Sequence, residues 1–274
     1  MIDTHSHLLP GLDDGAADMA EALHLARAAA EAGVHEIICT PHVRDWGDPA
    51  LAIGPPVLVE TQAAIDLAGI PVRLHLGYEL TFSFAASLEV EDLPAMTMSE
   101  GTRALLIEMP HGGWPMRAED AVFRWRLQGY LPVLAHPERN DRVQREPEKL
   151  EALLKMGAVA QGTLPSVLGT FGVAARKAFL RLVADGNMAL VASDAHFSSR
   201  RPPSLTEGLE ALVKWAPEAD VALLAHENPQ RLLRGAPLRE PEPIRVRRAW
   251  EKYLLRPNKD ARPPARVDQG RRQA

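Results

Sequence analysis

The sequence predicts an α/β barrel of parallel strands. Short runs of β-branched and aliphatic residues alternate with stretches in which apolar residues recur at helical spacing. Each strand and the helix after it take about 25 to 35 residues, and a glycine closes most helical stretches, which is the pattern of parallel βαβ units. A chain of 274 residues is long enough to bury the core of one such domain.

Seven runs are expected to form strands. They are Ile2–Thr4, Glu36–Thr40, Val72–Gly77, Ala104–Met109, Pro132–His136, Ala158–Gly162 and Ala189–Asp194. Helices are expected between them, for example over Met19–Ala32 and Glu148–Met156. The glycines expected to end helices are Gly33, Gly69, Gly129, Gly157 and Gly186. No GxGxxG follows the first strand and no GxxxxGK[ST] occurs, so a barrel is favoured over a nucleotide-binding doubly wound sheet.

Charge divides the chain into a predicted domain at 1–238 and a basic, Pro/Arg-rich tail at 239–274. The tail carries 11 of the 31 Lys and Arg residues but only 5 of the 36 Asp and Glu residues, so the domain before it is acidic. An acidic body argues against nucleic acid as a partner. The tail is expected to be solvated or to bind a partner, with contact to an acidic membrane surface left open, and Ala249–Leu255 could form a short helix.

Other features restrict the compartment and the kind of site. The chain has no basic amino-terminal region and no apolar run of the roughly 18 residues that span a bilayer, so a soluble, cytoplasmic protein is expected. A single cysteine, Cys39, excludes an internal disulfide and a multi-cysteine zinc site. Any metal site must therefore use imidazole and carboxylate groups, and ten histidines are available.

Nearly every predicted strand ends in a side chain that can bind a metal ion. These residues are His5, His7, His42, Glu79, Glu108, His136, Asp194 and His196. The carboxyl ends of barrel strands open onto one face, so these side chains are expected to converge. Residues two apart on a strand point the same way, which aligns each His-x-His or Asp-x-His pair. One such residue alone would more often be a surface or core residue, but eight at equivalent positions predict a metal cluster.

Five histidines fall outside this pattern, and structural or surface roles are expected for them. They are His24, His35, His75, His111 and His226. Among them, His111 comes closest to an exception because it follows the fourth predicted strand.

The segment CTPHVR resembles a phosphate-binding cysteine loop but does not match it. Arg44 lies five residues after Cys39, and the sixth position is Asp45, so the Cys-x₅-Arg spacing is absent. Cys39 is expected to be a buried strand residue and not a nucleophile.

Six segments in order resemble the signature of the PHP (polymerase and histidinol phosphatase) superfamily. They are HSHLLPGLDDG, TPH, GYE, IEMP, AHPERN and SDAHFSSRRPP, and the resemblance extends over residues 1 to about 235. They are most similar to the branch of manganese-dependent protein-tyrosine phosphatases from bacterial capsule and exopolysaccharide clusters. That resemblance implies a distorted (β/α)₇ barrel with three metal ions, in agreement with the seven predicted strands.

The resemblance also implies which residues hold each ion. His5, His7, Glu79 and Asp194 would hold the first ion, the bridging Glu79 with Glu108 and His136 the second, and Asp14, His42 and His196 the third. Asp13 remains an alternative to Asp14. The donor set suits manganese, iron or zinc, and the family favours manganese.

By the same resemblance, Arg139 and Arg201 would bind phosphate through their guanidinium groups. Asn140 follows Arg139, where many relatives carry an aromatic residue. The implied activity is hydrolysis of phosphotyrosine on protein, with a hydroxide bridging two ions as nucleophile. The implied protein partner is a bacterial tyrosine autokinase that controls capsule or exopolysaccharide synthesis.

Two alternatives remain open at this point. One is a phosphatase of the same superfamily that acts on histidinol phosphate or another small phosphomonoester, or a nuclease-like member. The other is a metal-binding regulatory protein without turnover.

Overall fold

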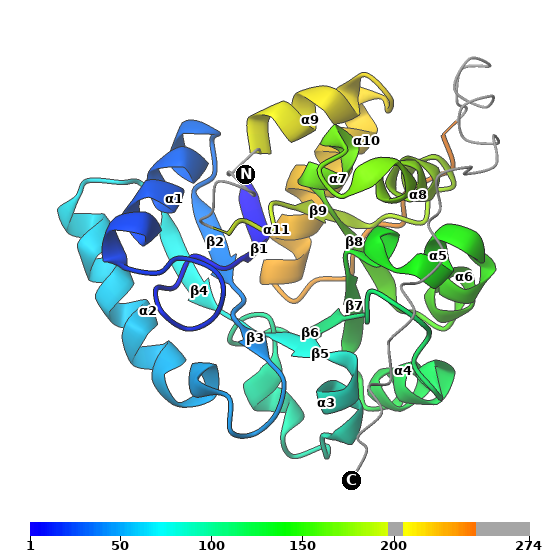
Figure 1. Cartoon of the computed structure of the whole chain (residues 1–274), viewed down its shortest axis with the longest axis horizontal. Helices are drawn as coiled ribbons and strands as arrows, with labels where there is room; N and C mark the ends of the chain where they lie inside the picture. Colours follow the sequence, from blue (N-terminus) through cyan, green and yellow to red (C-terminus); the bar gives the residue numbers. More distant parts are fainter. Residues whose placement is uncertain (197–204, 245–274) are drawn as a thin grey trace, which may run out of the picture.

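Parallel strands stand at the centre of the structure and helices surround them (Figure 1). The computed structural model describes residues 1–196 and 205–244. The strands are β1 (Ile2–Ser6), β2 (Glu36–Cys39), β3 (His42–Val43), β4 (Arg73–Leu76), β5 (Glu79–Thr81), β6 (Ala104–Glu108), β7 (Leu131–Ala135), β8 (Val159–Thr163) and β9 (Leu190–Ala192). The longer helices are α1 (Met19–Glu31), α2 (Pro49–Leu67), α4 (Ala118–Leu127), α6 (Glu148–Lys155), α8 (Gly172–Ala184) and α9 (Leu205–Val213). The short ones are α3 (Phe82–Ser87), η1 (Leu93–Met96), η2 (Pro137–Arg139), α5 (Asp141–Arg145), α7 (Leu164–Leu168), α10 (Glu218–Ala222), η3 (Leu223–Glu227) and α11 (Asn228–Leu233).

All seven predicted strands are confirmed, as β1, β2, β4, β6, β7, β8 and β9. The short strands β3 and β5 were not predicted. Pairing is parallel throughout and falls into two sheets, ordered β1-β2-β4 and β3-β5-β6-β7-β8-β9. This arrangement is the predicted distorted (β/α)₇ barrel.

The two extra strands arise because two long strands bend. Pro41 separates β2 from β3, and its backbone has no N–H to donate to a neighbouring strand. Gly77 separates β4 from β5, yet its N–H still donates to the carbonyl of Cys39 at 2.9 Å. The N–H of Glu79 donates in turn to the carbonyl of Pro41 at 3.1 Å. β2 and β3 are therefore two parts of one bent strand, and so are β4 and β5. Counted in this way, the nine short strands among the described residues occupy the seven predicted positions.

The first strand also lies beside the chain that follows the last one. Ser6 and Ala195 form an isolated parallel bridge. The N–H of Asp194 donates to the carbonyl of His5 at 2.9 Å, and the N–H of His7 donates to that of Ala195 at 3.0 Å. These bonds bring together segments separated by about 190 residues, including predicted ligands from both.

Alternate residues of the strands divide the core into two apolar clusters. In β6, Leu105 and Ile107 join the larger cluster, which also holds helix residues such as Trp125 and Phe179. Leu106 joins a smaller cluster made mainly of strand residues. Because successive strand residues point to opposite faces, the smaller cluster fills the interior between the strands. It forms an apolar layer inside the barrel.

Helix ends follow the sequence closely. The predicted helices at Met19–Ala32 and Glu148–Met156 are α1 and α6, each one residue shorter. Asp18 caps α1 by accepting a hydrogen bond from the N–H of Glu21 at 3.0 Å. All five glycines expected to end helices have positive φ, from 66° to 95°.

The described start of the predicted tail packs against the barrel. Arg239 exchanges two backbone hydrogen bonds with the side chain of Asn228, at 2.9 Å each, and the N–H of Ile244 donates to Ala184 at 2.8 Å. The remainder, including the segment 249–255, lies outside the described residues, and the boundary at 238 stays a prediction. None of the helices within 1–196 and 205–244 combines the length and apolar character that crossing a bilayer requires.

The bend at Gly77 gives a test of the fold. A Cβ at this position would lie 2.3 Å from the carbonyl oxygen of Met98 and 2.8 Å from its Cα. Backbone atoms cannot move aside as a flexible side chain can, so Gly77→Ala should lower the free energy of unfolding by about 1–3 kcal/mol. Gly112→Ala is the control, since a Cβ there has no neighbour within 4 Å. Urea denaturation measures both, and equal stability of the two variants would contradict this account.

Candidate metal centre

The predicted ligands converge at the carboxyl ends of the strands, around a cavity of about 390 Å³. The lining residues are Asp13, Asp14, His42, Arg44, Glu108, His111, His136, Arg139, Asp194 and His196. His5, His7 and Glu79 contact this group from a buried position, with 0%, 1% and 0% of their surfaces exposed. The structure thus brings all nine sequence-predicted ligands together.

Glu79, at the start of β5, lies at the centre of the cluster. Its Oε2 atom is 3.3 Å from His5 Nε2, 3.3 Å from His7 Nε2 and 3.0 Å from His42 Nδ1. Its Oε1 atom is 2.9 Å from His136 Nε2. Within the described part of the chain, the buried Oε2 atom and the Nδ1 atom of His136 have no hydrogen-bond partner. A buried carboxylate with imidazoles around both oxygens is suited to bridge metal ions.

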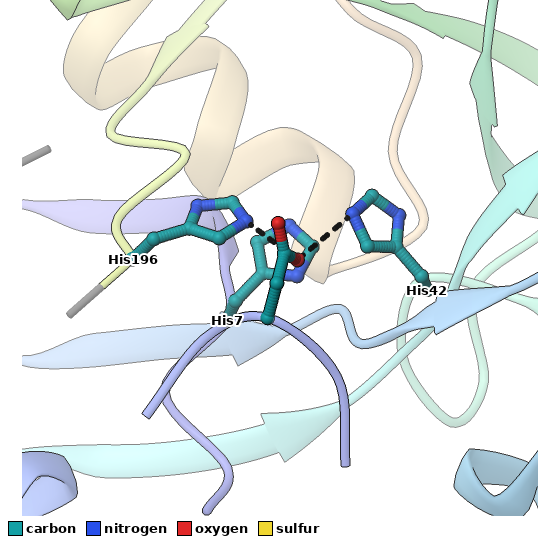
Figure 2. A group of neighbouring side chains, drawn as sticks. His7, His42 and His196 are labelled. Atoms are coloured by element: carbon teal, nitrogen blue, oxygen red, sulfur yellow. Dashed lines mark ion pairs between the residues drawn. The ribbon is translucent and has the colours of Figure 1, made fainter. Parts of the chain in front are cut away.

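A second group surrounds Asp14, in the loop after β1. Its Oδ1 atom lies 3.2 Å from His196 Nε2 and 3.4 Å from His42 Nε2. Figure 2 shows His42 and His196 with the ring of His7 between them. The rings of His7 and His196 stack at 4.0 Å. One ligand atom from each of these four residues lies within 4.8 Å of the others, which is a spacing that one ion can bridge.

The neighbouring Asp13 has a different position, and the geometry favours Asp14 as the ligand. Asp13 Oδ2 accepts hydrogen bonds from His7 Nδ1 at 2.7 Å and from the backbone N–H of His42 at 3.0 Å, and its Oδ1 accepts from Gly15 at 2.8 Å. An ionised carboxylate can only accept a hydrogen bond, so Nδ1 of His7 must carry a proton. Its Nε2 atom is turned toward the cluster. Asp13 belongs to no ligand group found among residues 1–196 and 205–244.

Two other histidines are oriented in the same way. The side chain of Gln161, on β8, donates to Thr4 at 2.9 Å, so its oxygen accepts from His5 Nδ1, also at 2.9 Å. The Nδ1 atom of His196 lies 2.9 Å from the backbone carbonyl of Asp194 and donates to it. Each ring therefore presents Nε2 to the cluster, and Nε2 is one of the two imidazole nitrogens that can bind a metal ion.

Two of the predicted ligands have left-handed backbone conformations. His136 has φ 32° and Asp194 has φ 49°. Such residues cost about 1–3 kcal/mol each and persist only where neighbouring contacts enforce them. Here hydrogen bonds to neighbouring strands enforce the two conformations. The N–H of His136 donates to the backbone carbonyl of Gln161 at 2.7 Å, and the N–H of Asp194 donates to that of His5 at 2.9 Å. Strain at these two positions is typical of functional sites.

Opposite charges control the ionisation of the cluster. Burial opposes the charged form of Glu79, but His5 and the other imidazoles outweigh it and hold its pKa well below the usual range. Burial likewise disfavours protonation of His42, but the neighbouring carboxylates of Asp14 and Glu79 outweigh it and raise its pKa to about 10. The pKa values of His5 and His7 are also raised, because neighbouring carboxylates outweigh the effect of burial. In the absence of ions, these histidines therefore hold protons that divalent ions would displace.

Arg139 lies at the edge of this cluster, in η2. Its Nη1 atom is 3.0 Å from Asp194 Oδ2, while Asp194 Oδ1 lies 3.5 Å from the Nε2 atoms of His5 and His7. Asp194 therefore connects the arginine to the metal-binding group. The ring of Phe171 lies against the guanidinium, with its centre 4.3 Å from Cζ. An aromatic ring therefore contacts Arg139, although the residue that follows it in the sequence, Asn140, is not aromatic. The second predicted arginine, Arg201, lies outside the described residues.

Of the five histidines assigned structural or surface roles, one lies at the site. The sequence interpretation of His111 is incomplete, since its ligand atom lies within 4.8 Å of those of Glu108 and His136. The other four, His24, His35, His75 and His226, belong to no ligand group among the described residues.

Cys39 is fully buried, and burial raises the pKa of its thiol. A buried, protonated thiol is a poor nucleophile, which agrees with the expectation from sequence.

Sequence reasoning missed two supporting residues, although each has a sequence pattern that could have identified it. Asp3 accepts a hydrogen bond from the N–H of Ser193 at 3.0 Å and connects β1 to the segment before Asp194. Asp3 lies two residues before His5, so the rule that residues two apart on a strand point the same way applies to it as it does to His5 and His7. Gln161 is a polar residue within a predicted aliphatic strand.

The fold and the donor set define an α/β barrel with a candidate metal centre at the carboxyl ends of its strands. The chain belongs to the CpsB/CapC family of capsular polysaccharide synthesis, whose model matches residues 1–234. The family resemblance seen in the sequence is thereby confirmed.

Individual relatives agree with this assignment. The tyrosine-protein phosphatase YwqE of Bacillus subtilis is 33% identical over 261 residues, covering 91% of this chain and 99% of the relative. The putative tyrosine-protein phosphatase CapC of Staphylococcus aureus is 31% identical over 204 residues, covering 74% and 79%. A solved structure, from work on YwqE and Streptococcus pneumoniae CpsB as "unique metal-dependent tyrosine phosphatases", matches with a TM-score of 0.80 and 35% identity, covering 89% and 99%.

The ionisation of the histidines predicts that ions and protons compete. Protonated His42 stabilises the ion-free fold fully below its unfolded pKa of about 6.5, and this contribution is lost as pH rises through the folded value of about 10. Near neutral pH, loading with Mn²⁺ should therefore release protons, and the apparent affinity should rise with pH. Calorimetry in buffers of different ionisation enthalpy measures this release. Heats that do not depend on the buffer would contradict the assigned protonation.

Proposed function

We propose that this protein is a metal-dependent protein-tyrosine phosphatase that hydrolyses phosphotyrosine on protein. The observation that carries the proposal is the buried carboxylate of Glu79, which has imidazole nitrogens around both oxygens. Two of these imidazoles, those of His42 and His136, line the same cavity as Arg139. The family match and the tyrosine-phosphatase relatives support the same activity.

The proposed centre holds three divalent ions, with manganese as the preferred metal. His5, His7, Glu79 and Asp194 would hold the first ion, Glu79 with Glu108 and His136 the second, and Asp14, His42 and His196 the third. Bound divalent ions supply Lewis acidity and lower the pKa of coordinated water toward about 7. The mixed imidazole and carboxylate donors suit manganese, and the resemblance to manganese-dependent relatives supports both the number and the metal.

The residues of the chain bind and orient the groups that react. Arg139 is positioned by Asp194 and Phe171, and its planar fork matches two oxygens of a phosphoryl group. Arg201 is proposed as a second phosphate-binding arginine on its sequence position alone. Asp13 and Gln161 hold His7 and His5 in the required tautomers. A tyrosine phenol, with a pKa near 10, leaves more readily than an alkoxide and depends less on a general acid.

We assign the protein substrate to a bacterial tyrosine autokinase that controls capsule or exopolysaccharide synthesis, in the cytoplasm. The family description, capsular polysaccharide synthesis, supports this context. The chemistry requires a phosphotyrosine on an accessible segment, because the cavity of about 390 Å³ must admit an aryl phosphate attached to a protein.

A direct assay tests the activity. Purified protein loaded with Mn²⁺ should release phosphate from a phosphotyrosine peptide, and a chelator should abolish turnover because the proposed nucleophile is a metal-bound hydroxide. Added Mn²⁺ should restore it. Cys39→Ala should retain activity, since the thiol is buried and protonated.

Three outcomes of this assay would oppose the proposal. Turnover that persists after complete removal of metal would exclude this mechanism. Preference for histidinol phosphate or an oligonucleotide over the peptide would assign the chain to another substrate class. Failure of the metal-loaded protein to hydrolyse any aryl phosphate would indicate a binding protein without turnover.

The role of Arg139 has its own test. Arg139→Lys keeps the charge but loses the fork, so kcat/KM for an aryl phosphate should fall about 10²–10³-fold. Bound metal should stay at the wild-type level, because Arg139 is not a ligand. Arg142→Lys is the matched control, an exposed arginine three positions away that pairs with Glu146. Equal activity of the two variants would remove Arg139 from the mechanism.

A further inference from the structure

We propose that His111 is an additional ligand of the second metal ion, beside Glu108 and His136. The proposal rests on the proposed metal centre and concerns a histidine that the ligand scheme of the family does not include. It also implies that metal binding releases one nitrogen of the Arg139 guanidinium, Nη2, to bind phosphate.

The position of the imidazole supports metal binding. The ligand atoms of Glu108, His111 and His136 lie within 4.8 Å of one another. The rings of His111 and His136 meet edge to face, with centres 5.9 Å apart. All three residues line the same cavity of about 390 Å³. A single ion can therefore reach all three side chains.

The backbone of the loop that carries His111 is fixed to the segment after Arg139. The carbonyl of His111 accepts from the N–H of Asp141 at 2.9 Å, and the N–H of Gly113 donates to Asp141 Oδ1 at 2.9 Å. The side chain of Asn140 donates to the carbonyl of Gly113 at 3.1 Å and also to that of Pro110. His111 is exposed, but these four bonds hold its backbone in place, as a preorganised ligand requires.

The coordination needs of the second ion point to the same residue. In the ligand scheme this ion has three protein ligands, Glu79, Glu108 and His136, whereas the first ion has four. Manganese prefers six donors in an octahedral arrangement. His111 would raise the number of protein ligands of the second ion to four and leave the remaining positions open to water and substrate.

His111 also contacts Arg139, and this contact cannot coexist with metal ligation. Arg139 Nη2 lies 3.0 Å from His111 Nε2, and a guanidinium can only donate, so the imidazole lone pair accepts this bond. A neutral imidazole has one lone pair. If an ion takes it, Nη2 of Arg139 is released while Nη1 stays paired with Asp194. Metal loading would then free one arm of the fork for a phosphoryl oxygen.

Metal retention tests the proposal without relying on activity. Wild-type protein, His111→Asn and His24→Asn are loaded with Mn²⁺, titrated with a competing chelator, and analysed for bound metal. In His111→Asn, one of the bound ions should be lost at a chelator concentration about 10–100-fold lower than in wild-type protein. His24, an exposed histidine on α1, is the matched control, and its variant should behave as wild type. Melting in excess chelator should be the same for all three if the fold is intact.

A second variant places a spectroscopic probe at the same position. His111→Cys loaded with Co²⁺ should show a thiolate-to-cobalt charge-transfer band in the near ultraviolet. Wild-type protein should lack this band, because its one thiol, Cys39, is buried and protonated.

The outcomes separate this proposal from the proposed function. Wild-type metal retention in His111→Asn, or no charge-transfer band in cobalt-loaded His111→Cys, would overturn the role of His111 while leaving the phosphatase proposal in place. Weaker binding of one ion in His111→Asn, together with the new band in His111→Cys, would support the role of His111 even if no phosphotyrosine peptide were hydrolysed. A wild-type protein that binds no Mn²⁺ would overturn both.

Discussion

The carboxylate of Glu79 is the constraint on which the rest of the structure depends. It is fully buried, and imidazole nitrogens from His5, His7, His42 and His136 lie within 3.3 Å of its two oxygens. A buried charge is tolerated only when it is paired or coordinates metal. The ends of β1, β3 and β7 must therefore meet at β5, which requires a barrel whose carboxyl ends share one face.

The barrel is distorted in ways that serve this convergence. The bends at Pro41 and Gly77 divide two strands into four and place His42 opposite Glu79 in the register of β3 and β5. Left-handed backbone at His136 and Asp194 turns the chain where β7 and β9 end. These local costs are offset by cross-strand hydrogen bonds and by burial of the apolar cluster inside the barrel.

Asp194 joins the histidine cluster to Arg139. One of its oxygens faces the histidines and the other holds Arg139. The charge on Asp194 is therefore shared between an arginine and the histidines, and a change at either partner alters the other. This connection places candidate metal ligands and an arginine suited to bind phosphate around one cavity of about 390 Å³.

Local patterns in the sequence determined the seven strands, the glycines that end helices and the candidate metal-binding side chains. Those features depend on residues close together in the chain, through backbone periodicity and glycine conformation. Only the tertiary structure decided that Asp13 orients His7 while Asp14 faces the cluster, that Gln161 holds His5, and that His111 belongs to the site. Each of these depends on which atoms of distant segments face one another. That is set by strand register and loop packing, which neighbouring residues do not specify.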